Sequence, residues 1–584
     1  STTPNRAARR ATLRKAGLVG SGALLVGAAP LALIAGTSGV AHAATFAVIN
    51  TLDSGPGSLR GALADATAGD TVDLTGISGT ITSTGYMLLP AGVNVVGPGA
   101  ATLTIDGNSA NIFSVSGSGS ATLSGVTLTG GGSVSRGGAI NCRNEGPDTD
   151  LTISDVVFDA NSSTGSGGAV NWQHCGDLTI TGSTFTDNTS ARGGALRFYY
   201  AYGTLTVSDS TFAHNSATAT GGAAFFSGYG SVVITNTTFY DNSSTGNTGA
   251  LYANSTTLTM TDVEFDSNHA ADNGGAFALY ATSDSVLTRV DVHDNTSAHG
   301  GGAYLHGLGS QGPLTITDSR FVDNTALYGG GAIIGTAMVD ATTSISSTTF
   351  SGNSAQRGGA LYLHAGDADP DTLLTIDSST FSGNHASNTG GAIQIETDNV
   401  EIVNSTISGN SSEYYGGGIY TASDLTLTFV TVTGNTQPHN LGAGLLVKGS
   451  TATVSSSIIA GNSRGGDASG MASGTLAADH SVIGFYEIAF VDNGGNVTGV
   501  ADPGLGALAD NGGPTLTMLP TVSSPAIDRG PASTPITTDQ RGTPWLRVYG
   551  TKADAGAVEL QPDPRPQPEP IPEPEPEPEP TFTG

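Results

Sequence analysis

Hydrophobic and polar residues alternate in short runs along most of the chain, and no apolar stripe of helical spacing is long enough to compete with them. The runs Leu151-Thr152-Ile153, Leu178-Thr179-Ile180 and Leu205-Thr206-Val207 each place every second side chain on one face of a strand. Residues that favour turns, mainly Gly, Asn, Asp and Ser, separate the runs. The pattern therefore predicts a chain built from short strands and turns.

Two motifs recur with one period. A Gly-Gly-Ala-apolar motif, with small variations, returns every 26–32 residues, and an apolar residue followed three positions later by Asn returns in step with it. The Gly-Gly motifs begin at residues 137, 167, 193, 221, 248, 274, 301, 330, 358, 390, 416 and 442. The asparagines are Asn161, Asn188, Asn215, Asn242, Asn268, Asn295, Asn324, Asn353, Asn384, Asn410, Asn435 and Asn462. Two motifs that share a period indicate a solenoid.

The period also predicts the architecture of one coil. About 27 residues accommodate three short strands and three turns, and coils stacked roughly 4.8 Å apart pair each strand in parallel with its counterpart in the next coil. The usual crossover preference makes the coil right-handed. We therefore expect an all-β, right-handed parallel β-helix of about 12 or more coils, in which the asparagines form a structural ladder and the glycines form a corner.

Both motifs carry a family resemblance. Together they resemble the repeat of polymorphic outer-membrane proteins, which are surface-displayed β-helices, and residues 128–465 carry it. This resemblance implies an adhesin-like role. The segments 510–515, 539–542 and 554–559 resemble the choice-of-anchor Q domain of exported proteins, so we expect residues 466–560 to hold the last coils and a C-terminal cap. We expect the Asp and Arg residues of the cap to be buried and paired, with a catalytic set as the alternative.

The flanking segments predict export. Residues 1–43 combine five basic residues with an apolar run and resemble a twin-arginine signal; a general secretory signal and a membrane anchor are the alternatives. Residues 44–127 are expected to form an N-terminal cap and the first coils, with a helix from Leu59 to Ala66. Residues 561–584 alternate Pro with Glu and predict a disordered acidic spacer. Such a spacer is compatible with an exported protein that is attached to the cell wall and with one that is released.

Composition narrows the classes of partner. The formal net charge is -29, so nucleic acid is excluded as a partner, because such a surface repels phosphate. We expect an extracellular or cell-surface monomer with no transmembrane span after signal removal.

The two cysteines, Cys142 and Cys175, are expected to form a disulfide between successive coils, although their positions after the Gly-Gly motif differ by three residues. A free buried thiol at Cys142 is the alternative.

Two outward columns of side chains are candidates for binding. Positions four and six after the first Gly of a motif should face solvent, because a strand alternates. They hold Tyr199, Phe225, Tyr252, Tyr280, Tyr362, His364 and Tyr420. Aromatic rings on a rigid face can contact sugars or protein side chains, whereas the simpler interpretation is that loops cover them.

A second column is rich in threonine and resembles ice-binding solenoids. Its members are Thr152, Thr179, Thr206, Thr259, Thr288, Thr315, Thr375 and Thr426. Val233 and Glu401 interrupt the column, and threonine is also a common strand residue, so ice binding is a minor alternative.

Few residues in the sequence indicate metal binding or catalysis. Asp367, Asp369 and Asp371 could turn toward one calcium ion, but the spacing lacks the remaining ligands of an EF-hand, which favours solvated turn acids; we expect no other cofactor. The histidines are dispersed over different columns, which argues against a shared transition-metal site. The arginines of the repeat region are scattered, and the best pair available for catalysis, Arg192 with Arg197, is expected to be solvated.

These observations favour a binding protein over an enzyme. There is no adjacent Asp-Asp pair of the kind expected for β-helical hydrolases, and no catalytic residue is assigned. The leading interpretation is an exported β-helix that binds an extracellular glycan or a cell-surface protein. A polysaccharide lyase or glycoside hydrolase is the alternative.

Overall fold

The computed structural model describes residues 43–228, 230–307, 312–336, 342–364, 373–396, 399–463 and 466–563. The predicted export signal, apart from its last residue, the calcium candidates Asp367, Asp369 and Asp371, and most of the predicted Pro/Glu spacer lie outside the described residues. No helix among the described residues is long and apolar enough to cross a membrane.

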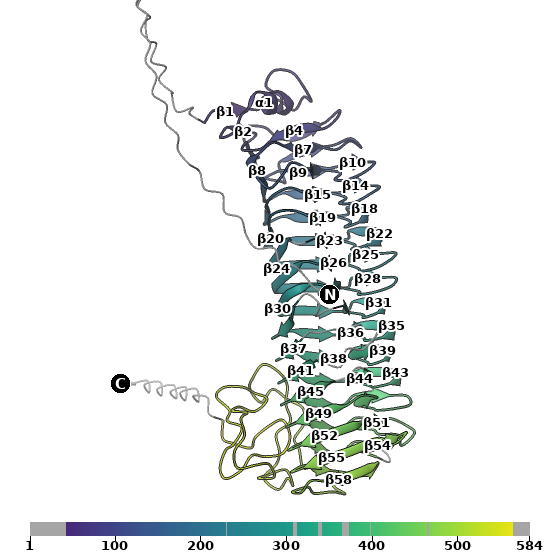
Figure 1. The fold of residues 1–584 in the computed structure, drawn as a ribbon. Coiled ribbons are helices and arrows are strands. Elements are labelled where there is room, and N and C mark those ends of the chain that lie inside the picture. Colours follow the sequence, from purple (N-terminus) through teal and green to yellow (C-terminus); the bar gives the residue numbers. More distant parts are fainter. Residues whose placement is uncertain are drawn as a thin grey trace, which may run out of the picture. The chain divides into compact units, whose positions relative to one another are not determined.

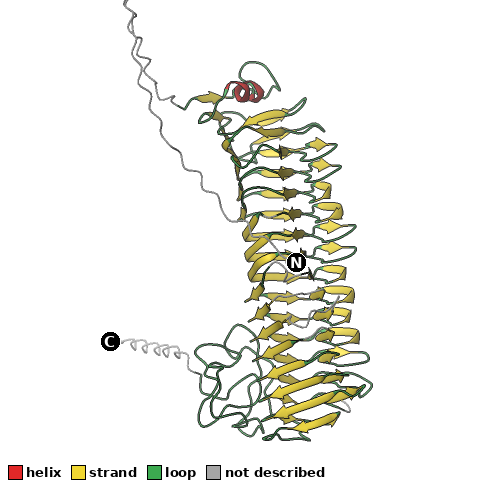
Figure 2. Ribbon diagram, in the orientation of Figure 1, coloured by secondary structure: helices red, strands yellow, loops and turns green. Residues whose placement is uncertain are grey.

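The described chain winds into stacked coils whose strands pair in parallel, so the predicted β-helix is confirmed (Figure 1). Within the described residues the strands form three sheets of 31, 11 and 16 strands. One coil runs through β11 (Ile140–Arg143), β12 (Thr149–Ser154), β13 (Val157–Asp159) and β14 (Ser162–Ser163), and β15 (Val170–Gln173) begins the next coil beside β11. Figure 2 shows strands through the whole body and a helix near its first coils.

One of the three strand positions is bent into two. Both β12 and β13 belong to the 31-stranded sheet, and the bend between them lies at Asp155, whose φ is 54°. Asp209 and Asp262 take the same left-handed conformation in later coils, with φ values of 51° and 54°. Aspartate tolerates this conformation better than most residues, so it can turn the sheet without a glycine.

The 16-stranded sheet carries the candidate functional site. Its strands are β4 (Met87–Pro90), β7 (Phe113–Ser116), β11, β15, β19 (Leu196–Tyr199), β23 (Ala224–Ser227), β26 (Leu251–Asn254), β29 (Phe277–Tyr280), β32 (Ala303–His306), β36 (Ile333–Thr336), β40 (Leu361–His364), β44 (Ile393–Glu396), β48 (Ile419–Thr421), β51 (Leu445–Lys448), β54 (Ala468–Met471) and β57 (Tyr486–Glu487).

The 11-stranded sheet adjoins it across the Gly-Gly corner. Its strands are β10 (Gly132–Ser133), β14, β18 (Thr189–Arg192), β22 (Ser216–Thr220), β25 (Ser243–Ser244), β28 (His269–Ala270), β31 (Thr296–His299), β35 (Thr325–Gly329), β39 (Ser354–Arg357), β43 (His385–Thr389) and β47 (Ser411–Ser412).

Phenylalanines of successive coils stack inside the solenoid. The ring centroids of Phe158 and Phe185 lie 4.4 Å apart, those of Phe185 and Phe212 lie 4.5 Å apart, and those of Phe212 and Phe239 lie 4.9 Å apart. All four side chains are buried. Because the coils repeat in register, one apolar position per coil produces a continuous column of rings through the core.

The asparagines of the second motif form a hydrogen-bonded ladder. The Asn268 Nδ2 donates to Asn295 Oδ1 at 3.0 Å and to the Phe239 carbonyl at 2.9 Å. Asn268 Oδ1 accepts from the backbone N and the Nδ2 of Asn242, both at 3.0 Å. The same arrangement continues from coil to coil as far as Asn462, whose Nδ2 donates to Asp467 instead.

The first coils are preceded by a short helix. Helix α1 (Leu59–Asp65) begins after Ser58, whose Oγ accepts a hydrogen bond from the Gly61 backbone N at 3.2 Å. It ends one residue earlier than expected, because Ala66 is already extended, with φ -74° and ψ 144°. The buried Leu59 packs into the core that the first coils share. The helix thus covers apolar surface that would otherwise face water.

The C-terminal segment packs against the side of the 31-stranded sheet. Residues 503–560 follow the last strand, β58 (Ala489–Asp492). Gln540 accepts a hydrogen bond from Thr406 and donates one to Thr380, at 2.5 and 2.8 Å. The backbone N of Ala557 donates to Thr431 Oγ1 at 2.9 Å. The segment therefore covers several coils laterally.

The acids and arginines of this segment are buried and paired. Arg541 contacts Asp539 at 2.6 Å, and Arg547 contacts Glu559 at 3.3 Å, with all four side chains at most 3% exposed. Burial raises the pKa of Glu559 to about 7. Such enclosed pairs hold the loops of the segment together.

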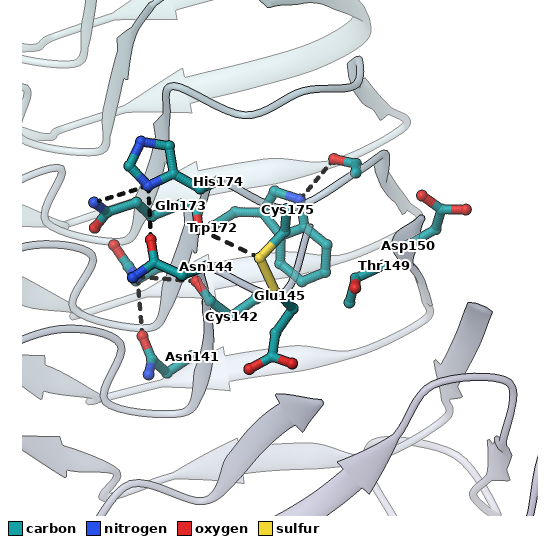
Figure 3. Close-up of a disulfide and its surroundings, with 12 residues drawn as sticks. Asn141, Cys142, Asn144, Glu145, Thr149, Asp150, Trp172, Gln173, His174 and Cys175 are labelled. Carbon is teal, nitrogen blue, oxygen red and sulfur yellow. Dashed lines mark hydrogen bonds between the residues drawn. A yellow bond between two sulfur atoms is a disulfide. The ribbon is translucent and has the colours of Figure 1, made fainter. Parts of the chain in front are cut away.

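A disulfide joins Cys142 and Cys175 (Figure 3). The three-residue offset noted in the sequence is present, since Cys142 pairs in register with Trp172 and not with Cys175. The chain turns after β15 at His174, whose φ is 51°, and this turn brings the Cα atoms of the two cysteines to 6.5 Å. The bond fastens two successive coils together.

Candidate ligand-binding face

The outward side of the 16-stranded sheet forms one long surface, which we call the outer face. Strand pairing aligns its side chains in two columns. The first column contains Asn171, Arg197, Phe225, Tyr252, Ala278, Tyr304, Ile334, Tyr362, Gln394 and Tyr420. The second contains Arg143, Gln173, Tyr199, Ser227, Asn254, Tyr280, His306, Thr336, His364 and Glu396.

All seven predicted aromatic and histidine residues lie on the outer face, but two are covered. Tyr199, Phe225, Tyr252 and Tyr280 are half-buried and His364 is exposed. The expected exposure is wrong for two tyrosines, Tyr362 and Tyr420, which are each only 7% exposed.

Tyr362 is covered because its ring lies against Gly329, which has no side chain to hold it away. A Cβ on that glycine would lie 2.4 Å from the Tyr362 ring.

Tyr304 and His306, which were not among the predicted residues, extend the two columns. The coil that carries them contains three consecutive glycines, Gly300 to Gly302, and the repeat spacing places the start of the motif at the second one. The structure shows that Gly300, with φ 65°, occupies the corner position. Tyr304 and His306 are the fourth and sixth residues after Gly300 and therefore take the outward positions. With three consecutive glycines, the sequence does not show which of them occupies the corner.

The rings of the outer face touch one another along the solenoid. Phe225 and Tyr252 stack face to face with their centroids 5.0 Å apart and their planes at 3°. Tyr252 and Tyr280 lie 5.1 Å apart, and Tyr280 and Tyr304 lie 5.5 Å apart, tilted by 33° and 32°. Rings that cover each other's faces present mainly edges and hydroxyl groups to a ligand. Open ring surface must therefore be sought at the end of this stack.

A pocket of about 450 Å³ opens at that end, beside the corner with the 11-stranded sheet. Three tyrosines and several polar side chains line it. Its wall includes His299, Tyr304, Tyr328, Arg357, Tyr362 and His364. Tyr328 is 48% exposed, so this wall remains accessible. A concave site with aromatic walls and a few convergent polar groups is typical of a small-molecule or sugar site.

Glu396 organises one side of the pocket. Its Oε2 accepts hydrogen bonds from the Tyr362 hydroxyl at 3.0 Å and lies 3.1 Å from His364 Nδ1. Its Oε1 accepts from Gln394 at 2.7 Å. Burial, followed by the charge of Glu396, raises the pKa of Tyr362 to about 12, so this hydroxyl remains protonated at neutral pH. The network fixes the orientation of the polar wall.

A second polar cluster lies on the 31-stranded sheet. His293 Nδ1 is 3.0 Å from Asp294 and 3.4 Å from Asp266, and its Nε2 is 3.3 Å from Glu264. The ligand atoms of His293, Asp266 and Asp294 all lie within 4.8 Å of one another, so these residues are the group among the described side chains that could hold a metal ion. Ion pairing with a protonated histidine already accounts for the arrangement.

This cluster predicts a pH dependence of stability. Partial burial lowers the pKa of His293, but hydrogen bonds to Asp294 and Glu264 outweigh that effect and raise it above its ordinary value of 6.5. The folded protein therefore binds this proton more tightly than the unfolded chain, and the stabilisation, complete below pH 6.5, is lost as pH rises through the raised pKa.

We expect the free energy of unfolding to fall above pH 6.5 by more in the native protein than in His293→Gln, measured by urea denaturation between pH 5 and 9. Parallel curves for the two proteins would show that His293 is not paired in this way. His269→Gln, a change at an exposed histidine outside this cluster, is the control.

The threonine column is less regular than the sequence suggests. Thr152, Thr179 and Thr206 are aligned, but an irregularity in β30 (Ser283–His293) pairs Thr259 with Val286. Thr288 pairs with Thr261 instead, so its assignment to the column is wrong. Val286, in register with Thr259 and Thr315, therefore interrupts the hydroxyl column on which the ice-binding alternative depends.

Comparison with known proteins agrees with this architecture. Residues 168–368 and 334–498 match the family model described as a right handed beta helix region. These matches cover more than half of the chain, so the protein belongs to the right-handed β-helix family. No curated protein matches the sequence.

A solved structure with partial similarity is the crystal structure of tailspike protein 3 of bacteriophage CBA120, which is 12% identical. The match covers 67% of this chain and 54% of the tailspike, with a TM-score of 0.28. The chain thus spans about half the length of that tailspike, and the superposition carries no functional argument.

Proposed function

We propose that this protein is an exported β-helix that binds an extracellular glycan on its outer face. The observation that carries the proposal is the row of touching rings from Phe225 to Tyr304 that leads into the tyrosine-lined pocket. A rigid sheet holds these side chains in place before the ligand arrives, so little conformational entropy is lost on binding.

The pocket suits a sugar ring better than an apolar ligand. Tyr304 and Tyr328 provide ring surface for the C–H groups of a sugar, while His299 and Arg357 provide donors for its hydroxyl groups. The edges and hydroxyls of the ring row can contact further sugar units along the solenoid axis. A cell-surface protein is the other class of partner, and it would need a broader contact than one pocket.

Changing the open wall of the pocket tests the proposal. We expect the double variant Tyr304→Ala/Tyr328→Ala to bind glycan about 10 to 100 times more weakly, because two aromatic contacts of about 1 kcal/mol each are lost. Binding to a panel of extracellular polysaccharides, with and without calcium, is measured by affinity electrophoresis and calorimetry.

The matched control is Tyr240→Ala/Tyr549→Ala, which removes two exposed tyrosines outside the outer face. Equal binding by the pocket variant and the control would remove the pocket from the proposal. Binding to no polysaccharide, together with capture of a surface protein, would favour the other class of partner.

An enzymatic role is the second candidate, and the pocket supplies a specific reason to test it. Arg357, Tyr362 and His364 line one cavity. A histidine held by a carboxylate can act as a general base. Sustained release of new chain ends from a bound polysaccharide, abolished by His364→Ala, would establish catalysis; binding without cleavage would exclude it for that polysaccharide.

A further inference from the structure

A second region of distinct chemistry lies on the outer face and at its corner with the 11-stranded sheet, several coils before the pocket. Arg143 lies in β11, Arg192 in β18 and Arg197 in β19, and Arg136 lies in the corner strand position two coils before Arg192. No other lysine or arginine occurs between residues 61 and 288. Four cations thus gather within three successive coils of an otherwise strongly acidic chain.

Arg197 is the centre of this group, and the expectation that it is solvated is wrong, because the side chain is almost completely enclosed. The residue is only 6% exposed. Its NH1 donates to Asn171 Oδ1 at 2.9 Å and to Gln173 Oε1 at 3.1 Å, both neutral acceptors. Its guanidinium carbon lies 3.9 Å above the centre of the Tyr199 ring. Its Nε is buried and has no hydrogen-bond partner.

The cluster lacks the acids that accompany other arginines of the protein. Arg60, Arg289 and Arg320 each form an ion pair with an aspartate, and so do the buried arginines of the C-terminal segment with their acids. Among the described residues, none of the four clustered arginines forms such a pair. A buried guanidinium without a counter-charge is costly.

The neighbouring arginines increase that cost. Burial, followed by the positive charge of Arg136, lowers the pKa of Arg197 to about 10. Arg192 and Arg143 act in the same direction. Their mutual repulsion would be relieved by a bound anion, and a planar guanidinium matches the paired oxygens of a carboxylate or sulfate.

We propose that Arg197 and the three arginines near it form a subsite for a carboxylate or sulfate group, and that the glycan bound by the outer face is therefore acidic. That a polysaccharide carries the anion rests on the proposed function. That the bound group is an anion rests on the arginine cluster itself. The subsite and the pocket lie on the same face, so one extended chain can reach both. The overall negative charge repels polyanions elsewhere, which confines them to this region.

The test compares four probes at constant ionic strength: polygalacturonate, dextran sulfate, neutral dextran and polyglutamate. We expect the native protein to bind at least one of the two acidic polysaccharides about tenfold or more tightly than neutral dextran, as charge-assisted hydrogen bonds predict. The exposed arginines are changed together in Arg143→Gln/Arg192→Gln, which we expect to lose that preference.

The matched control is Lys448→Gln/Lys552→Gln, which removes the same charge from two exposed lysines, one of them in the second column of the same sheet. We expect it to bind the acidic polysaccharides within about twofold of the native protein, because the lost charges are distant and screened. Equal weakening in both double variants would show a general charge effect and overturn the subsite.

A variant of the central residue separates charge from shape. Arg197→Lys keeps the positive charge but loses the planar guanidinium that lies over Tyr199, so we expect weaker binding of the acidic polysaccharides with little change in the melting temperature. If this variant unfolds, the exposed double variant still decides the question, since neither Arg143 nor Arg192 is buried.

Failure of the inference and failure of the proposed function give different results. Equal binding of acidic and neutral polysaccharides that depends on Tyr304 and Tyr328 would overturn the subsite alone. Tight binding of polyglutamate that depends on the arginines would identify an acidic peptide and overturn the glycan assignment. Binding of an acidic polysaccharide that depends on the arginines, but not on the tyrosines, would support the subsite and overturn the pocket.

Discussion

Phe212→Ala is expected to lower the free energy of unfolding by about 4 kcal/mol, the largest effect of any change considered for this protein. The ring lies between those of Phe185 and Phe239 and is 1% exposed. Its removal therefore loses buried apolar area and leaves a cavity between two rings that rigid neighbouring coils hold apart.

Hydrogen exchange and urea denaturation measure this loss. Because each coil contacts mainly its neighbours, we expect faster exchange in the coils that contain Phe185, Phe212 and Phe239, with distant coils unchanged. The control is Phe212→Leu, since Leu128 occupies the equivalent position of an earlier coil. A loss of 1 kcal/mol or less for Phe212→Ala would mean that the column is loosely packed.

Asn268→Ala is expected to cost about 3 kcal/mol. The change removes the acceptor of two Asn242 donors and the donor to the Phe239 carbonyl and to Asn295 Oδ1. Asn295 Oδ1 still accepts from the backbone N of residue 268, so the cost falls on the other three buried polar groups, at about 1 kcal/mol each. Alanine cannot replace any of these bonds, and water has no access to Asn268, which is fully buried.

The comparison is with Asn254→Ala, a change at a half-buried asparagine of the outer face, for which we expect a loss below 1 kcal/mol. The free energies of unfolding of both variants are measured by urea denaturation. Similar losses for the two variants would show that the ladder contributes no more than an ordinary surface asparagine.

The fold could be predicted from the repeat because the repeated residues are those that the backbone conformation of each coil favours. The local conformation and the stacking of coils favour a glycine at the corner, which only Thr248 replaces among the twelve motifs, and an asparagine such as Asn268 at the next turn, so these residues mark the period directly. The bend at Asp155 was not predicted, because aspartate is common in every kind of turn and does not distinguish a bend within a sheet from a loop.

The candidate site was less predictable because it depends on neighbours that are distant in sequence. The outward positions of Tyr362 and Arg197 follow from strand alternation, but their burial depends on what the adjacent coils place beside them. Gly329 exposes backbone on which the Tyr362 ring lies. Arg197 is enclosed with Asn171, Gln173 and Tyr199. The repeat motif does not specify the residues at these positions, so it does not predict this contact.

The disulfide between Cys142 and Cys175 also has a mechanical consequence. A solenoid pulled from its N-terminal side can release its coils one after another, and each coil of about 27 residues adds about 90 Å of extended chain. The disulfide closes a loop over a sequence separation of 33 residues. Under oxidising conditions roughly 110 Å of chain is therefore withheld from extension. A pulling force applied at that end bypasses the loop and acts next on the strands that follow Cys175.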